Sequence, residues 1–229
     1  MITFASVITN HQVRNMLDRL KLIIILTLVP ILATACSGNA SESQPVASQP
    51  AKAEVKEQPV LPAQPTGSAF IVISKRDQTL SVYDLDTSGD TIMVAQFPCC
   101  MGKNKGNKVK RGDMRTPESP AGTPFKITMI QDASTWHHDF KDGRGSILAY
   151  GHWFLRLETP GHKGIGIHGS TNNEQTVPGR ASEGCIRLLD KDIITLKEHF
   201  AYVGMPVTVQ PEDQAPLPWE LRARQRNTQ

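Results

Sequence analysis

Two residues in the second half of the chain have side chains that suit nucleophilic catalysis. Cys185 lies in the stretch SEGCIRL at residues 182–188, and His168 lies upstream in the stretch IHGS at residues 167–170. A cysteine attacks a carbonyl group as the thiolate, and a neighbouring imidazole can take its proton. Glycines in both stretches let backbone amides approach a developing oxyanion closely. We therefore expect Cys185 to be a nucleophile and His168 to be its general base and the acid that protonates the leaving group.

Each of these two residues also has a structural interpretation. A cysteine is often buried in a core, and a lone histidine at the end of a strand often has only a structural role. The polar residues Ser182 and Glu183 favour an exposed loop around the cysteine over a core strand. The histidine directly follows a strand expected at residues 164–167, which favours a side chain that faces a cleft. The catalytic interpretation is therefore preferred for both.

Together the two stretches resemble the catalytic motifs of the L,D-transpeptidase catalytic domain, the YkuD-type family of bacterial cell-wall enzymes. That family has a His-Gly-X stretch followed by Ser/Thr-His-Gly-Cys-Ile/Val-Arg. The resemblance covers roughly residues 68–210 and departs from the pattern at Glu183, where the family most often has a second histidine. It implies a cysteine-dependent acyltransferase that needs no metal or organic cofactor. The matching positions are His168, Gly169, Ser182, Gly184, Cys185, Ile186 and Arg187.

The resemblance also implies roles for residues around the catalytic pair. The imidazole should be oriented by a backbone carbonyl or a small polar side chain just after it, which points to Gly169 or Ser170. A carboxylate at Glu183 would disfavour the thiolate unless it points away or meets a cation. For Arg187 the alternatives to substrate binding are an ion pair with Glu183 or bracing of the loop, and Ser182 could be purely structural. Backbone amides expected to form the oxyanion hole are those of Glu183, Gly184 and Cys185. Substrate binding is expected at Arg187, Ser182, Tyr150 and Trp153.

Short alternating stretches of apolar and β-branched residues predict a mostly β domain with one or two helices, an L,D-transpeptidase-type β-sandwich or open barrel. One helix is expected to begin with Asp190 as its N-cap and to end near Gly204. Residues 108–125 are rich in turn formers and resemble the family's Thr-Pro-x-Gly-x-Phe stretch beside the cleft, or else are simply a loop. Strands are expected at residues 70–74, 79–85, 91–97, 125–130, 153–157, 164–167 and 205–209.

The first 35 residues have the composition of a secretory signal segment. A basic stretch precedes an apolar run at residues 22–32 that is too short to span a bilayer comfortably, and small residues follow. Met16 would start a signal of ordinary length. The sequence ATAC ending at Cys36 resembles a lipoprotein cleavage site and predicts lipidation of that cysteine. A plain secretory signal cut after Ala35 is the alternative.

The expected organisation is a signal segment at residues 1–35, a lipid-anchored disordered tether at 36–66, a catalytic domain at 67–210 and a flexible basic tail at 211–229. The tether is rich in Ser, Gln, Pro, Ala, Glu and Lys, a composition that cannot bury a core. We expect a periplasmic protein held on a membrane by its lipid. Ser37 after the lipidated cysteine favours the outer membrane.

Composition argues against several other classes of function. The net charge of +3 is too small to indicate nucleic acid as the main partner. The seven histidines show no recognised zinc-ligand spacing, so no metal site is expected. The expected partners are peptidoglycan stem peptides and, through the lipid anchor, a membrane, and the protein is expected to be monomeric.

Cys99 and Cys100 are adjacent, in a chain expected to reach a compartment that permits disulfides. Neighbouring cysteines seldom pair with each other. We expect one of them to be buried in a strand, and the other could form a disulfide with Cys185 that switches the enzyme off.

These features favour peptidoglycan L,D-transpeptidation, in which Cys185 attacks the carbonyl between the third residue of a tetrapeptide stem and its terminal D-alanine. An amine of another stem would then resolve the thioester and form a cross-link between third residues. The same site could serve an L,D-carboxypeptidase if water resolves the thioester, or an amidase or protein-attaching enzyme. A more distant alternative is a wall-binding lipoprotein with an inactive site. Residue types and spacing do not separate these acceptors.

Overall fold

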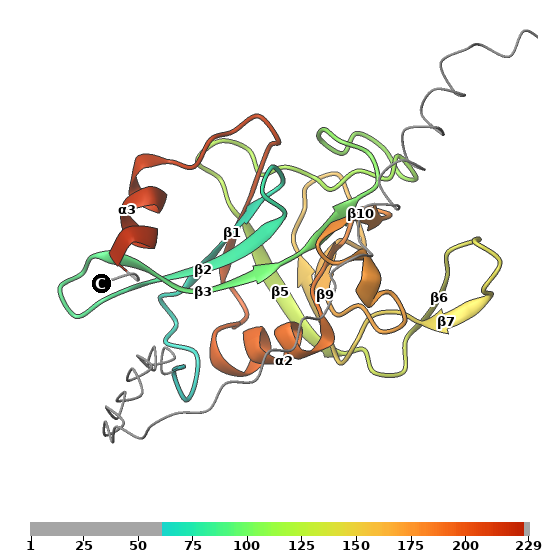
Figure 1. The fold of residues 1–229 in the computed structure, drawn as a ribbon, viewed down its shortest axis with the longest axis horizontal. Helices are drawn as coiled ribbons and strands as arrows, with labels where there is room; N and C mark the ends of the chain where they lie inside the picture. Colours follow the sequence, from blue (N-terminus) through green and yellow to red (C-terminus); the bar gives the residue numbers. More distant parts are fainter. Residues whose placement is uncertain (1–60, 227–229) are drawn as a thin grey trace, which may run out of the picture. The chain divides into compact units, whose positions relative to one another are not determined.

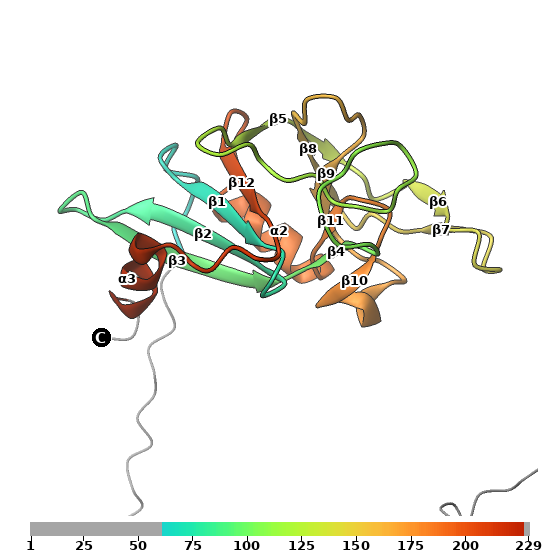
Figure 2. The ribbon, with the colours of Figure 1, turned by 90° about the horizontal axis from the view of Figure 1, so that it is seen from above.

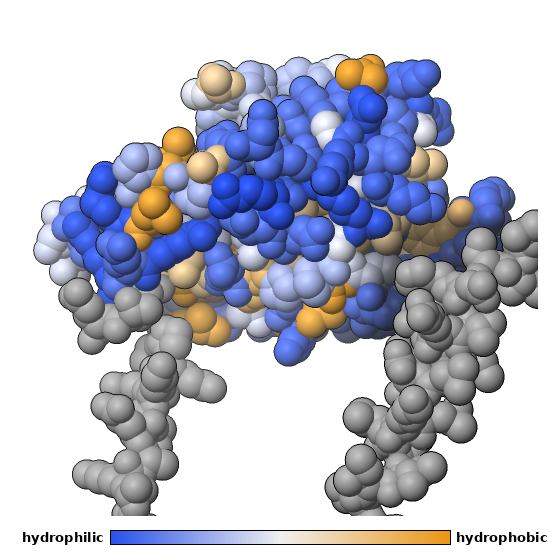
Figure 3. Space-filling view, turned by 45° about the horizontal axis from the view of Figure 1, so that its top comes forward, coloured by the Kyte–Doolittle hydropathy of each residue, from blue (hydrophilic) through white to orange (hydrophobic). Residues whose placement is uncertain are grey.

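The computed structural model describes residues 61–226. The predicted signal segment, the lipidation site Cys36 and most of the predicted tether lie outside the described residues, as do residues 227–229. Within the described part no helix has the length and apolar composition needed to cross a bilayer. The face drawn in Figure 3 is largely hydrophilic, and its apolar residues form small, separate groups.

The described residues form a mostly β domain, as the sequence predicts (Figure 1). Ten strands make one mixed sheet in the order β10-β4-β11-β9-β8-β5-β12-β1-β2-β3, and β6 and β7 form a separate hairpin. The strands are β1 (Phe70–Ser74), β2 (Thr79–Leu85), β3 (Thr91–Pro98), β4 (Cys100–Gly102), β5 (Phe125–Asp132), β6 (His137–Asp139), β7 (Ser146–Leu148), β8 (Trp153–Leu157), β9 (Gly166–His168), β10 (Gly179–Ser182), β11 (Ile186–Arg187) and β12 (Pro206–Gln210). The helices are the 3-10 helix η1 (Glu174–Thr176), α2 (Asp190–His199) and α3 (Pro218–Arg226).

All seven strands predicted from the sequence are present, and β1, β2 and β8 have the predicted bounds. The strand predicted at residues 164–167 begins two residues later, as β9. The strands that the sequence did not predict, β4, β6, β7, β10 and β11, have two to four residues each. Stretches this short cannot display the two-residue alternation that identifies a strand.

Strand β5 joins the two halves of the large sheet. Its first residues pair with β12, and the rest of the strand pairs with β8. The two halves enclose one core, in which Ile71 and Val82 from one half belong to the same apolar cluster as Ile167 and Ile186 from the other. The strands that carry the predicted catalytic pair are therefore buried on their core side. Helix α2 contacts β8 and β9, and so supports them.

The C-terminal segment differs from the flexible tail that its composition suggested. Helix α3 packs beside β3 in both views (Figures 1 and 2). Its Trp219 ring lies 5.1 Å from the Tyr83 ring and 5.7 Å from the Phe70 ring, centroid to centroid. Glu220 is 1% exposed and accepts a hydrogen bond from the side-chain amide of Gln210. Helix α3 covers the aromatic rings on the outer face of β1 and β2. The arginines in this segment made its apolar side difficult to recognise from the sequence.

Candidate active site

The pairing of β9 with β11 brings the predicted nucleophile and base to one face of the sheet. These strands are parallel, with Ile167 opposite Ile186 and His168 opposite Arg187. Continued by one residue, this register places Cys185 beside Gly166. Side chains alternate along a strand, so the cysteine lies on the same face as the histidine two residues further along β9. Both residues line one cavity of about 320 Å³.

His168 is 3% exposed and lies between aromatic rings. Its ring is stacked on that of Phe154 at 5.6 Å and lies 4.8 Å from that of Tyr150. Its Nδ1 lies 2.7 Å from the backbone carbonyl oxygen of Gly169. A carbonyl oxygen only accepts hydrogen bonds, so Nδ1 carries the proton and donates it, and Nε2 is the basic nitrogen. Of the two orienting candidates, Gly169 contacts the ring through its carbonyl.

Burial and the positive charge of Arg187 lower the pKa of His168 from 6.5 to about 3, against the opposing effect of the Gly169 carbonyl. The ring is therefore neutral over the physiological range. Burial raises the pKa of Cys185, although the Gly166 amide and Arg187 act in the opposite direction. The pair is consequently a thiol and a neutral imidazole.

The hydroxyl of Ser170, the other orienting candidate, is fully buried and has no hydrogen-bond partner among the described residues. Its backbone N–H instead donates to Oδ1 of Asp190 at 2.7 Å, and the Thr171 hydroxyl donates to the other oxygen of the same carboxylate. Asp190 is therefore not the N-cap that the sequence suggested, because the cap position is Leu189 and Asp190 is the first helical residue. Its carboxylate fixes the segment that follows His168.

No side chain fits at Gly169. A Cβ there would lie against Oδ1 of Asp190 and 2.8 Å from Cα of Gly151. A contact under 3 Å would force one of these groups to move. Glycine at this position therefore lets the Asp190 carboxylate come close enough to bind the backbone after His168.

The loop that carries Cys185 is held by Ser182. The Ser182 hydroxyl donates to the carbonyl of Cys185 at 2.6 Å and accepts from the N–H of Gly184 at 3.1 Å. Gly184 has a φ of +140°, which favours glycine. The Cys185 sulfur donates to the carbonyl of Gly164 at 3.4 Å. Of the three predicted oxyanion-hole amides, that of Gly184 is thus engaged within the loop.

Glu183, the residue that departs from the family pattern, is exposed and faces the β6–β7 hairpin. Its Oε2 lies 3.4 Å from Nε2 of His138. Its negative charge raises the pKa of Cys185, but less than burial does. Glu183 thus faces a histidine 45 positions earlier in the chain, which the sequence did not link to the site and which is a cation only when protonated.

Arg187 is 3% exposed, and its guanidinium lies over the Phe140 ring at 4.9 Å. It forms no ion pair with Glu183 within the residues that the structure describes. Tyr150 lines the cavity, as predicted for a substrate-binding residue, but Trp153 does not. Trp153 packs on the core, with the ammonium of Lys197 4.4 Å from its ring. The neighbouring Phe154 stacks on the imidazole, and alternation along β8 turns Trp153 to the other face.

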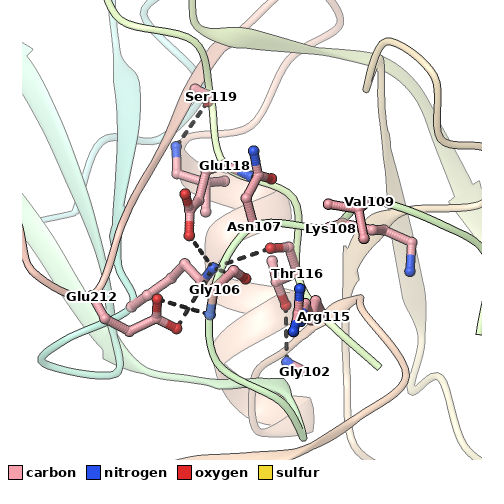
Figure 4. A network of polar contacts seen from close by, with 12 residues as sticks. Gly102, Gly106, Asn107, Lys108, Val109, Arg115, Thr116, Glu118, Ser119 and Glu212 are labelled. Atoms are coloured by element: carbon pink, nitrogen blue, oxygen red, sulfur yellow. Dashed lines mark hydrogen bonds and ion pairs between the residues drawn. The ribbon is translucent and has the colours of Figure 1, made fainter. Parts of the chain in front are cut away.

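Sequence reasoning missed the cationic side of the cavity, which is formed by Lys108, Arg111 and Lys163. Two of these residues lie in the loop between β4 and β5. The fully buried ammonium of Lys75 holds this loop by donating to the carbonyls of Gly106 and Thr116, at 2.8 and 3.1 Å, and to Glu118 at 2.6 Å (Figure 4). The sequence around basic residues in a glycine-rich loop does not indicate where their side chains lie in the folded protein.

Cys99 and Cys100 are both fully buried, and burial raises the pKa of Cys99. Cys185 and these two residues are all free cysteines, so the disulfide considered from the sequence is not formed. Among the described residues no three His, Cys, Asp or Glu side chains are grouped so that they could hold a metal ion.

The family model described as the L,D-transpeptidase catalytic domain, YkuD, matches residues 68–209. A search of curated proteins gave no match. Similar solved structures include Bd1075 of Bdellovibrio bacteriovorus, with a TM-score of 0.46 and 18% identity, which covers 75% of this chain and 60% of that one. An L,D-transpeptidase from Mycobacterium smegmatis has a TM-score of 0.41 and 21% identity, covering 62% of this chain and 58% of that one. The chain thus spans 60% or less of these two proteins.

Proposed function

Because the chain belongs to the YkuD family of L,D-transpeptidase catalytic domains, we propose that it cross-links the third residues of peptidoglycan stem peptides. The proposal rests on one observation above all. A cysteine and a neutral histidine line the same cavity, and the hydrogen bond from Nδ1 to Gly169 leaves Nε2 of the histidine as the basic nitrogen.

In the proposed reaction, the sulfur of Cys185 attacks the carbonyl between the third residue and the terminal D-alanine while Nε2 of His168 takes the thiol proton. The tetrahedral intermediate collapses when the C–N bond breaks, and the imidazolium returns the proton to the departing amine of D-alanine. A thioester on Cys185 remains. An amine of a second stem attacks it, the C–S bond breaks, and the proton of that amine passes through His168 back to the sulfur.

This order of events suits a pair that is uncharged at rest. The low pKa of His168 makes its imidazolium a strong acid, which favours rapid protonation of the leaving amine. We assign the oxyanion to the amides of Glu183 and Cys185. The amide of Gly184 would join them only if the Ser182 hydroxyl released it.

The test is incubation of the purified full chain with tetrapeptide muropeptides, followed by mass spectrometry. Cross-linked dimers are expected from the wild type, whereas tripeptides alone would indicate a carboxypeptidase. Cys185→Ala should lose at least about a thousandfold in turnover, since no other cysteine among the described residues lines the cavity. The matched control is Cys99→Ala, which removes a thiol outside the cavity and should retain activity. Wild-type turnover by Cys185→Ala would refute the mechanism.

The site can also be tested without its natural substrate. A thiol-reactive carbapenem should add its mass to the wild type and to Cys99→Ala, but not to Cys185→Ala. Absence of the adduct in all three proteins would support an inactive wall-binding role.

We also propose that the mature chain begins at a lipidated Cys36 and acts in the periplasm. The support is the sequence ATAC after a short apolar run. Metabolic labelling with an alkyne fatty acid in cells should mark the wild type and not Cys36→Ala. Equal labelling of both would contradict the anchor.

A further inference from the structure

One wall of the catalytic cavity is basic. Lys108, Arg111 and Lys163 line it, and Glu183, the one carboxylate among the described residues that line the same cavity, faces His138. A second hollow of about 540 Å³ shares these three cations and adds His162. Gly164 borders both spaces, and its carbonyl oxygen lies 3.4 Å from the sulfur of Cys185. The nucleophile therefore lies where the cavity opens onto a cationic region.

Lys108 differs from the other buried lysine of this region, Lys75, in how its ammonium is bonded. An ammonium has three N–H donors. Lys75 uses them on two carbonyls and on Glu118. Lys108 is 7% exposed, and the only hydrogen-bond partner of its ammonium among the described residues is Oδ1 of Asp113, at 2.8 Å. Two of the ammonium's donors are thus left for a ligand, and in Figure 4 the Lys108 side chain extends away from Glu118 and Glu212.

The position of this ammonium is fixed relative to the nucleophile. Its Nζ lies 3.5 Å from the place that a Cβ at Gly184, the residue before Cys185, would occupy. Asp113, which holds Lys108, also accepts the backbone N–H groups of three residues in the same loop. The Lys108 carbonyl accepts a hydrogen bond from Nε2 of His162 at 3.0 Å. The cation is therefore held in place before any substrate binds.

A carboxylate is the ligand that this arrangement suits. A nearly buried ammonium with N–H groups that lack acceptors has a desolvation cost. A charge-assisted hydrogen bond to an anion offsets that cost. In the proposed reaction the residue that leaves is the last of the stem. Its free carboxylate lies three bonds beyond the carbonyl that Cys185 attacks, so it must lie close to the nucleophile loop.

We propose that Lys108, supported by Arg111 and Lys163, is the subsite for the free C-terminal carboxylate of the donor stem. This inference rests on the proposed function, because it uses the position of the bond that Cys185 attacks. The subsite would make the enzyme selective for stems that end one residue after the scissile bond. Stems that continue further, or whose terminal carboxylate is blocked, lose the interaction.

The test compares a tetrapeptide stem with the same peptide ending in a carboxamide. For the wild-type full chain we expect kcat/KM to be about 10- to 100-fold higher for the free acid, the range of one charge-assisted hydrogen bond. Lys108→Met should lower kcat/KM for the acid to that for the amide and change the amide value little. The matched control is Lys105→Met, an exposed lysine of the same loop that lines neither hollow. An acid preference that survives in Lys108→Met overturns the proposal.

Three further measurements keep the test decisive. Lys108→Arg keeps the charge and should retain the acid preference, and the double variant Arg111→Gln/Lys163→Gln should reduce it several-fold even if Lys108→Met fails to fold. Calorimetric binding of both peptides to Cys185→Ala needs no turnover. Acid-selective binding that is lost in Cys185→Ala/Lys108→Met supports the subsite even if the muropeptide assay fails. Equal binding of acid and amide by Cys185→Ala overturns the subsite and leaves the reaction unaffected.

Discussion

Substitution of Lys75 by methionine should destabilise the protein strongly, although Lys75 contacts neither Cys185 nor His168. Its side chain is fully buried, and its ammonium donates to two backbone carbonyls and to Glu118. Glu212 lies 3.6 Å from the same ammonium and is also bound by Arg180 at 2.7 Å. Methionine keeps most of the aliphatic stem and removes only the charge and the donors.

The expected loss can be worked out from these contacts. Breaking a buried ion pair by removing one partner costs about 3–5 kcal/mol, because the other charge is left unpaired. The carboxylates here are 16% and 20% exposed, so water can rehydrate them in part, and Arg180 continues to neutralise Glu212. The two carbonyls lose their donor in a buried site. We therefore expect the free energy of unfolding to fall by about 3 kcal/mol.

The measurement is urea unfolding of the full chain at pH 7, followed by tryptophan fluorescence and extrapolated linearly to water. The control is Lys141→Met, which removes an 83% exposed ammonium paired with Asp139 and should change the free energy of unfolding little, because solvent screens this ion pair. A loss in Lys75→Met no larger than that in the control would refute the assignment of Lys75 as the residue that holds the loop between β4 and β5.

Two further predictions concern stability. The pKa of His168 is about 3 in the folded protein and 6.5 in the unfolded chain, so the unfolded chain binds more protons between these values and stability falls as the pH is lowered. Between pH 6.5 and 4.5, urea unfolding should show that the wild type loses about 2 kcal/mol more than His168→Gln, and parallel pH profiles would contradict the buried neutral ring. Trp219→Ala should lower the free energy of unfolding by about 2–3 kcal/mol through loss of its contacts with two aromatic rings. The control is Leu221→Ala on the same helix. Leu221 is 48% exposed, so its substitution should lower the free energy of unfolding by less than about 1 kcal/mol, and equal losses in the two variants would argue against the packing of α3.

The sequence by itself determined most of the β-sheet and singled out two residues, Cys185 and His168, that the fold brings to one cavity. Alternation along β1, β2 and β8 is a local property of the chain, and it predicted the bounds of these strands correctly. The glycine-flanked Cys185 and His168 were identifiable because their chemistry is carried by residue types and by nearby neighbours. Both line one cavity, as their proposed partnership requires.

Tertiary structure decided what each neighbour of that pair contacts. The Gly169 carbonyl rather than the Ser170 hydroxyl meets the imidazole, and Trp153 faces the core while Phe154 stacks on the ring. Lys108 reaches the loop that carries Cys185 from a segment about 75 residues earlier in the chain, because the buried ammonium of Lys75 and the Asp113 carboxylate fix the course of that segment. Local sequence patterns indicate which face of a strand or helix is apolar. They do not indicate which distant element packs against that face, because this packing depends on the contacts of the whole folded chain.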